Sequence, residues 1–203
     1  MHDNILSIEQ KQLLPFIQSF KKEYYLVGGT AVSLQIGHRE SIDFDLFKFG
    51  NVQPQKIAQR LQTFGWDYQL IHKNEEGFHI IVNDVKVTFF QYPFTILTAQ
   101  KYESIKMPDL LHLAAMKAYA LGRRAKWKDY ADLYFIFKDY HSVEEVSAKA
   151  SEIFQGLFSP KLFKQQLCYF KGINYMEEIT YCIDPVSDDT IKEYLTELVT
   201  DSL

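Results

Sequence analysis

The sequence has little cysteine, no long apolar run and no excess of basic residues. Its two cysteines, Cys168 and Cys182, have no CxxC or histidine partner at a suitable spacing, so neither a disulfide framework nor a zinc site is indicated. We expect both to be ordinary interior thiols in a reducing compartment. No segment reaches the roughly 20 apolar residues of a membrane span, and residues 1 to 10 lack the order of a signal peptide. These absences predict a soluble, cytoplasmic protein without a membrane partner.

The charge balance excludes the broad basic surface with which general nucleic-acid coat proteins neutralise phosphates, because the formal net charge is -4 at pH 7. Residues 117 to 128 differ from the rest, since they hold five basic side chains and no acidic one. This segment predicts either a phosphate-facing patch or a solvated helix end whose cations favour the helix C-terminus.

Apolar residues make up 47% of the 203 residues, which is enough for a buried core. The pattern of apolar residues changes near residue 105, from one that indicates mixed strands and helices to one that is almost wholly helical. We therefore expect an α/β (α+β) domain with a mixed β-sheet and flanking helices over residues 1–104. A helical bundle over residues 105–203 is expected to pack on it and complete a cleft.

The first half predicts the order helix, strand, helix, strand, helix and three strands. Ser7 and Gln10 form a capping-box pattern for a helix that reaches about residue 22, and Pro15 is expected to kink or split it. Asn83-Asp84 predicts a tight hairpin turn. The expected strands are 24–27, 43–47, 68–72, 78–82 and 85–90, and the other expected helices are 30–37 and 55–64.

The second half predicts helices throughout. Asp109 is the expected N-cap of an apolar helix that reaches Leu121, and Gly122 can end this helix. Apolar spacing predicts a second helix over about residues 128–137. Further helices are expected near 143–155, 160–170 and 188–200, the last with Ser187 as its N-cap.

The most informative segment, GGTAVSLQIGHRESIDFDLF, begins at Gly28. Gly28 and Gly29 let the backbone approach a phosphate, the following helix N-terminus favours an anion, and Thr30 can add a hydroxyl. Asp43 and Asp45 lie two apart on an expected strand, so both side chains leave one face, about 6.5 to 7 Å apart. Such carboxylates can hold Mg²⁺ (or Mn²⁺), which keeps its waters and uses the phosphates of an NTP. A lone DxD is usually a solvated strand face, and most Gly-Gly steps are plain turns.

The combined order resembles the polymerase-beta-like nucleotidyltransferase superfamily, in which a Gly-Gly or Gly-Ser turn precedes Asp-x-Asp by a dozen or so residues. More narrowly, GGTAxxLxxGHRxSxDxDLF resembles the AbiEii/AbiGii toxin-like branch. A second match lies in the helical half, where Met116-Lys117 is followed by RRAKWKDYADLYFIF from Arg123 to Phe137. Together the matches span about residues 24 to 137, and the residues after 137 carry none.

The resemblance implies a nucleotidyltransferase fold and a metal-dependent enzyme that transfers a nucleoside monophosphate from an NTP to an acceptor hydroxyl. It further implies an RNA acceptor, such as the tRNA 3′ end, and a cognate antitoxin protein within a toxin-antitoxin or abortive-infection system. Asp43 and Asp45 would hold the metal, and Lys117 and Asp129 would complete the catalytic set from the helical half. By resemblance, Gly29 and Thr30 would hold the triphosphate. The expected nucleotide-binding set is completed by Gly28, Arg39, Ser41 and Arg124, although Arg39 can instead be a favourable cation at a helix end and Ser41 can cap a turn.

Several of these residues also have a structural interpretation. Lys117 lies in the otherwise apolar LLHLAAMKAYAL, so it should reach solvent, pair with a carboxylate or face a phosphate. Asp129 and Asp132 can instead supply a helix N-terminal charge and a helix–helix hydrogen bond, and Asp132 is expected to be the more structural. We expect His38 to be a hydrogen-bonded spacer outside the catalytic set.

The sequence departs from the superfamily pattern at a third carboxylate, which usually comes from a neighbouring strand. The aligned residue is Thr88, whose hydroxyl is a poor base at pH 7, and Asp84 falls in the expected turn. Three functions therefore stay open: the toxin enzyme, a small-molecule nucleotidyltransferase of the antibiotic-modifying kind, and a nucleotide-binding or partner-binding protein without turnover. We favour an enzyme because the glycine turn, both carboxylates and Lys117 occur together.

Overall fold

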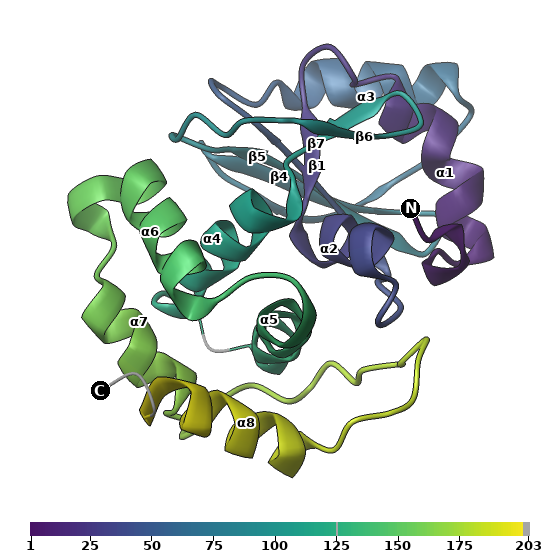
Figure 1. Cartoon of the computed structure of the whole chain (residues 1–203). Helices are drawn as coiled ribbons and strands as arrows, with labels where there is room; N and C mark the ends of the chain where they lie inside the picture. The colour runs from purple at the N-terminus through teal and green to yellow at the C-terminus, as the bar shows by residue number, and fades with distance from the viewer. Residues whose placement is uncertain (125, 201–203) are drawn as a thin grey trace. The chain divides into compact units, whose positions relative to one another are not determined.

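The structure, a computed structural model, describes residues 1–124 and 126–200 (Figure 1). The chain divides into two compact units, the first Met1–Asp109 and the second beginning at Leu110. The first unit holds a mixed sheet with helices, and the second is helical, so the expected α/β class is confirmed. No helix in the described ranges is long and apolar enough to cross a membrane.

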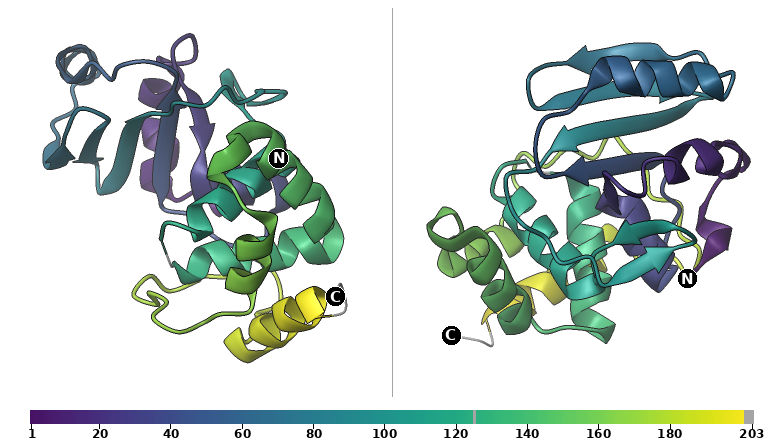
Figure 2. Two further views of the ribbon diagram at one scale, coloured as in Figure 1. Left: turned by 90° about the vertical axis from the view of Figure 1, so that its left-hand side faces the viewer. Right: turned by 90° about the horizontal axis from the view of Figure 1, so that it is seen from above.

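The sheet of the first unit has seven strands in the order β3-β4-β5-β2-β1-β7-β6. Figure 2 shows the ribbon from two further sides. Strand β2 runs parallel to β5 and antiparallel to β1, and β7 pairs in parallel with β1. The first five strands lie within two residues of the expected ranges. The bounds are β1 Tyr25–Val27, β2 Asp43–Lys48, β3 Gln69–Lys73, β4 Gly77–Val82, β5 Val85–Gln91, β6 Gln100–Tyr102 and β7 Ile105–Met107.

The last two strands were not predicted. Each has only three residues, which is shorter than the four to eight alternating residues that identify a strand, although β7 does alternate buried Ile105 and Met107 with exposed Lys106. Their hairpin turns at Glu103, which has a positive φ of 51°. Strand β7 lies beyond residue 104, so the sheet extends past the residue where the sequence pattern changes from mixed strands and helices to helices.

Strand alternation gives the sheet one buried face and one partly exposed face. On the buried face, Phe44 and Leu46 of β2 and Phe89 of β5 are fully buried. Helix α1 (Ile8–Gln18) packs against this face, because the ring of Phe16 lies 6.3 Å from that of Phe89. The other face therefore carries the polar side chains of β2 and β5.

The remaining helices of the first unit begin close to their expected positions. Helix α1 has the expected Ser7 capping box but ends at Gln18, because residues 19–23 form turns; Pro15 lies inside it without dividing it. The two turn residues Asn83 and Asp84 both have positive φ (49° and 61°), as a two-residue hairpin requires. The other elements are η1 Asp3–Ile5, α2 Gly28–Ile36 and α3 Pro54–Thr63.

The second unit contains the predicted helices. Ser187 accepts a hydrogen bond from the Thr190 N–H at 3.1 Å, which confirms the expected cap. Both cysteines are free, but Cys168 is exposed and Cys182 partly exposed, so the prediction of interior thiols was wrong. Both lie after α7, outside the packed helices. The elements are α4 Leu110–Leu121, α5 Trp127–Asp139, α6 Val143–Phe154, η2 Gln155–Leu157, α7 Pro160–Leu167 and α8 Asp188–Thr200.

Candidate functional site

The first unit presents Asp43 and Asp45 on the partly exposed face of β2. They alternate with the fully buried Phe44 and Leu46, so the packing of the core determines where the carboxylates point. Lys86 of β5 lies close to Asp43, with its Nζ 3.9 Å from Asp43 Oδ2. At this distance the ion pair is loose, and Lys86 is 40% exposed, so solvent screens it.

The glycine turn between β1 and α2 lies directly against these carboxylates. Gly28 has a positive φ of 73°, and a Cβ added to it would meet Asp45 Oδ2 at 2.1 Å. A Cβ on Gly29 would meet Arg39 Nη2 at 2.6 Å. The two glycines therefore leave room for a carboxylate on one side and a guanidinium on the other. The N-cap Val27 makes no side-chain cap bond to the first N–H groups of α2.

Thr30, Ser41 and Arg39 are buried around the turn. The Thr30 hydroxyl contacts Ser41 Oγ at 2.8 Å and the carbonyl of Asp43, so it connects α2 to the start of β2. Arg39 is 2% exposed, and its Nη1 donates to the carbonyl of Glu40 at 2.9 Å. These side chains hold the turn and the carboxylate strand in one arrangement.

Thr88 lies opposite Asp45 in the parallel pairing of β2 with β5, so the two side chains leave the same face. On its other side Thr88 pairs with His79 of β4, and His79 Nδ1 lies 3.2 Å from Thr88 Oγ1. Burial lowers the pKa of His79, and the charges of Lys86 and His72 lower it further. His79 was not among the predicted site residues.

The second unit brings Lys117, Asp129 and Arg124 together around a buried ion-pair cluster. Lys117 Nζ of α4 lies 2.8 Å from Asp129 Oδ1 and 2.5 Å from Asp132 Oδ2, both on α5. Arg124 Nε lies 3.2 Å from Asp129 Oδ2. Burial alone would raise the pKa of Asp129, but Lys117 and Arg124 outweigh it and hold that pKa below its ordinary value. Lys117 was expected to reach solvent, pair with a carboxylate or face a phosphate, and in the structure it pairs with two carboxylates.

The remaining cations of the basic segment also have partners within the second unit. Lys126 Nζ lies 2.7 Å from Glu177 Oε1, and Lys128 Nζ lies 3.6 Å from Glu177 Oε2. The Arg123 guanidinium lies 3.4 Å from the centroid of the Tyr119 ring and donates to the carbonyl of Leu157. The five basic side chains of this segment therefore each have a partner within the second unit.

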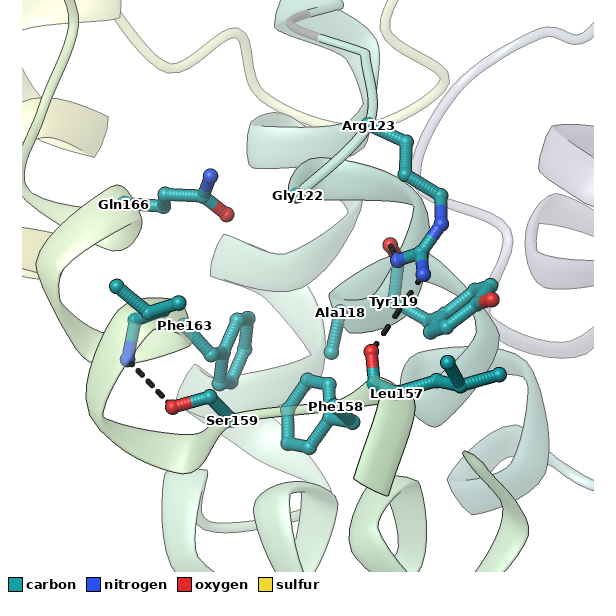
Figure 3. Close-up of a pocket in the computed structure, with 10 residues that line it drawn as sticks. Ala118, Tyr119, Gly122, Arg123, Leu157, Phe158, Ser159, Phe163 and Gln166 are labelled. Atoms are coloured by element: carbon teal, nitrogen blue, oxygen red, sulfur yellow. Dashed lines mark hydrogen bonds between the residues drawn. The ribbon is translucent and has the colours of Figure 1, made fainter. Parts of the chain in front are cut away.

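Arg123 lines a cavity of about 320 Å³ in the second unit (Figure 3). Aromatic and aliphatic side chains of α4, η2 and α7 form most of its wall, including Tyr119, Leu157 and Phe163. None of the site residues predicted from the sequence lines it. The predicted residues thus form two groups, the turn and carboxylates in the first unit and the ion-pair cluster in the second.

The two carboxylates have the chemistry that a divalent ion requires. Both are oxygen ligands on a partly exposed strand face, which leaves space for waters and substrate phosphates to complete an octahedral shell. Within residues 1–124 and 126–200, no group of three or more His, Cys, Asp or Glu side chains is arranged to hold a metal.

Comparison with known proteins gives a family and a fold. The sequence model described as "Nucleotidyl transferase AbiEii toxin, Type IV TA system" matches residues 16–167. An uncharacterized protein of Aquifex aeolicus (strain VF5) is 26% identical over 209 residues, covering 94% of this chain and 98% of that protein.

Two solved structures share the architecture. The nucleotidyltransferase toxin MenT4 of Mycobacterium tuberculosis superimposes with a TM-score of 0.64 at 13% identity, covering 96% of this chain and 82% of its own. The antibiotic-resistance factor ANT(2″)-Ia superimposes with a TM-score of 0.53 at 10% identity, covering 70% of this chain and 89% of its own. These likenesses confirm the expected nucleotidyltransferase fold.

Proposed function

The chain belongs to the AbiEii nucleotidyltransferase toxin family, and from this premise we propose that it transfers a nucleoside monophosphate from an NTP to an acceptor hydroxyl. The observation that carries the proposal is the contact between the glycine turn and the carboxylate strand, where a Gly28 Cβ would meet Asp45 Oδ2 at 2.1 Å. A phosphate-binding turn and a pair of metal-binding carboxylates are thus adjacent, as NTP-dependent transfer requires.

The residues around the glycine turn of the first unit have distinct roles in this reaction. The N–H groups at the start of α2 and the Arg39 guanidinium bind the triphosphate, and Gly28 and Gly29 leave room for it. Asp43 and Asp45 hold Mg²⁺ or Mn²⁺, which neutralises charge on the triphosphate. Thr30 and Ser41 act indirectly, because their hydroxyls connect α2 to β2.

Lys117, Asp129 and Arg124 serve the reaction from the helical unit. Lys117 carries a charge that two carboxylates hold in one orientation, so its ammonium group is preorganised before substrate binds. Arg124 is 54% exposed, which leaves its guanidinium accessible to a phosphate while it contacts Asp129. The RNA acceptor, such as the tRNA 3′ end, and the role as the toxin partner of an antitoxin follow from the family alone.

The position of Thr88 favours a second candidate, a nucleotide-binding protein without turnover. Thr88 lies opposite Asp45, where a third carboxylate would share the metals, and its hydroxyl is neutral. A small-molecule transferase has support only from the fold that the chain shares with ANT(2″)-Ia.

Incubation with each labelled NTP, Mg²⁺ and total RNA separates the candidates. Labelled RNA that depends on Asp43 and Asp45 supports the proposal. Binding of Mg-NTP without transfer to RNA or to small hydroxyl acceptors would support the binding protein instead. Label on a small antibiotic with free hydroxyl groups but not on RNA would support the small-molecule enzyme.

A further inference from the structure

Two phenylalanine rings lie on the strand face that carries Asp43 and Asp45. Phe47 is two residues beyond Asp45 on β2, and Phe90 of β5 is its partner in the parallel pairing, so both rings leave this face. Both are partly exposed, whereas Phe44 on the other face of β2 is fully buried. The face therefore combines charged groups with an aromatic surface that solvent can reach.

Neighbouring rings hold the position of Phe47. Its ring centroid lies 5.2 Å from that of Phe90 and 5.1 Å from that of Tyr92, at interplanar angles of 43° and 39°. Tyr92 is 8% exposed, and its N–H donates to the carbonyl of Lys48 at 2.8 Å, so the chain after β5 continues beside β2. A planar ligand that stacks here therefore meets side chains that are already in position.

The glycine turn, the carboxylates and the two rings follow one another along β2. Val27 of β1 lies opposite Asp45, and β1 runs antiparallel to β2. The glycine turn that follows Val27 therefore lies on the side of Asp45 away from Phe47. The step from Asp45 to Phe47 is about 6.5 to 7 Å. An NTP with its β- and γ-phosphates at the turn and its α-phosphate at the carboxylates therefore extends its ribose and base toward the rings.

A glycine and an imidazole complete the row beside Phe90. Gly77 of β4 pairs with Phe90, and the His79 ring lies over this glycine, because a Cβ added to Gly77 would meet Nε2 at 2.7 Å and Phe90 Cδ2 at 3.3 Å. His79 Nδ1 lies 3.2 Å from Thr88 Oγ1, and Nε2 makes no hydrogen bond to the described part of the chain. Nε2 therefore lies toward the aromatic row, away from the carboxylates, and a neutral imidazole can donate or accept one hydrogen bond there.

We propose that Phe47 and Phe90 stack the base of the NTP and that His79 Nε2 forms a hydrogen bond with the edge of that base. The inference rests on the proposed function and adds a nucleobase subsite to the same site. Every base has a flat face that stacks on an aromatic ring, whereas the donors and acceptors on the edge differ from base to base. Phe47 and Phe90 thus contribute affinity for all four NTPs, and His79 contributes the preference among them.

The test is calorimetry that compares each Mg-NTP with Mg-tripolyphosphate, which has the three phosphates but no base. Phe47→Leu and Phe90→Leu keep an apolar side chain and remove the ring. We expect each variant to weaken the binding of every NTP about 5- to 150-fold and to bind tripolyphosphate within about twofold of the parent. Phe90→Tyr keeps a ring and should retain the parental affinity for NTPs. Parental binding of tripolyphosphate also shows that a variant is folded.

Matched variants separate stacking from packing. Phe64 is 40% exposed and packs against Phe16 of α1 on the other side of the sheet, so Phe64→Leu should leave NTP affinity unchanged. Gly77 has no positive φ, so Gly77→Ala adds only the contacts with Nε2 and Phe90, and it should weaken the binding of NTPs but not of tripolyphosphate. His79→Ala should reduce the difference in affinity between the best-bound and the worst-bound NTP by about 2- to 10-fold.

Three outcomes would overturn the inference, and they differ in what they say of the function. Phe47→Leu and Phe90→Leu variants that match the parent with every NTP and with RNA would exclude the subsite and leave the proposed function intact. Variants that bind NTPs like the parent but bind RNA more weakly in a filter-binding assay would assign the rings to a base of the acceptor instead. A parent that binds neither Mg-NTP nor Mg-tripolyphosphate would exclude both the subsite and the proposed function.

Discussion

Replacing Gly28 with alanine tests whether the glycine turn and Asp45 form one site. Gly28 has a φ of +73°, and the added Cβ would lie 2.1 Å from Asp45 Oδ2. Gly65 is a matched control, because its φ is +72° and a Cβ there would meet nothing within 4 Å. Both variants place an alanine in the left-handed region, and only Gly28→Ala collides with a carboxylate.

The expected magnitudes separate stability from function. The left-handed conformation costs an alanine about 1 to 2 kcal/mol, which lowers the Tm of a protein of this size by roughly 2 to 8 °C in both variants. In Gly28→Ala the Asp45 oxygen must also withdraw by about 1 Å before the contact reaches 3.0 Å. Asp45 Cγ and Cβ would also lie at 3.0 and 3.2 Å from the added Cβ, so the movement adds a further loss of stability to that of the backbone. A displacement of about 1 Å at a reacting centre also lowers a rate about 100-fold.

The assay compares Tm, Mg-NTP affinity and transfer to RNA for the parent, Gly28→Ala and Gly65→Ala. We expect a lower Tm in both variants, with the larger loss in Gly28→Ala, together with parental transfer in Gly65→Ala and about 100-fold slower transfer in Gly28→Ala. Equal affinity and transfer in the two alanine variants would refute the argument that the turn positions Asp45.

Three further predictions concern the two groups of candidate residues. Asp43→Ala combined with Asp45→Ala should abolish Mg-NTP binding in calorimetry; parental affinity would exclude this metal site. Lys117→Met should lower the free energy of unfolding by about 3 to 5 kcal/mol, because Asp129 and Asp132 lose their shared cation. The same variant should slow transfer roughly 100- to 1000-fold. An unchanged rate with lower stability would show that Lys117 is purely structural. The pKa of Asp129 lies below 3.8, so its stabilisation is present above that pH and is lost as pH falls through the folded pKa. Urea unfolding between pH 2 and 7 should therefore show a smaller loss of stability in acid for Asp129→Asn than for the parent, and equal slopes would contradict the lowered pKa.

Local patterns predicted most of the elements because each left a signature in the chain. The alternation of Asp43, Phe44, Asp45 and Leu46 is sufficient to predict β2 and the face that its carboxylates occupy. The register between β4 and β5 also follows from the sequence, because Asn83 and Asp84 form a two-residue turn that pairs residues equidistant from it. Thr88 therefore had to lie opposite residue 79.

The remaining features depend on contacts distant in sequence. Strand β7 exists because Tyr25 of β1 pairs with Lys106, and nothing in its three residues indicates this partner. Lys117 could have met solvent, a phosphate or an acid, and only the packing of α4 beside α5 determines that it meets Asp129 and Asp132. The sequence likewise could not show why residue 28 is a glycine. It indicates room for a phosphate, but not that a side chain at this position would collide with Asp45.

The place of β2 in the sheet bears on how proteins of this fold can diversify. Strand β2 is the central strand of the sheet, with β5, β4 and β3 on one side and β1, β7 and β6 on the other. Fraying and insertions concentrate at edges and termini, where few backbone hydrogen bonds must break. Hydrogen exchange should accordingly be slowest for the β2 amides. Edge hairpins can thus lengthen or change sequence over evolutionary time, and the carboxylate strand stays in register while they do.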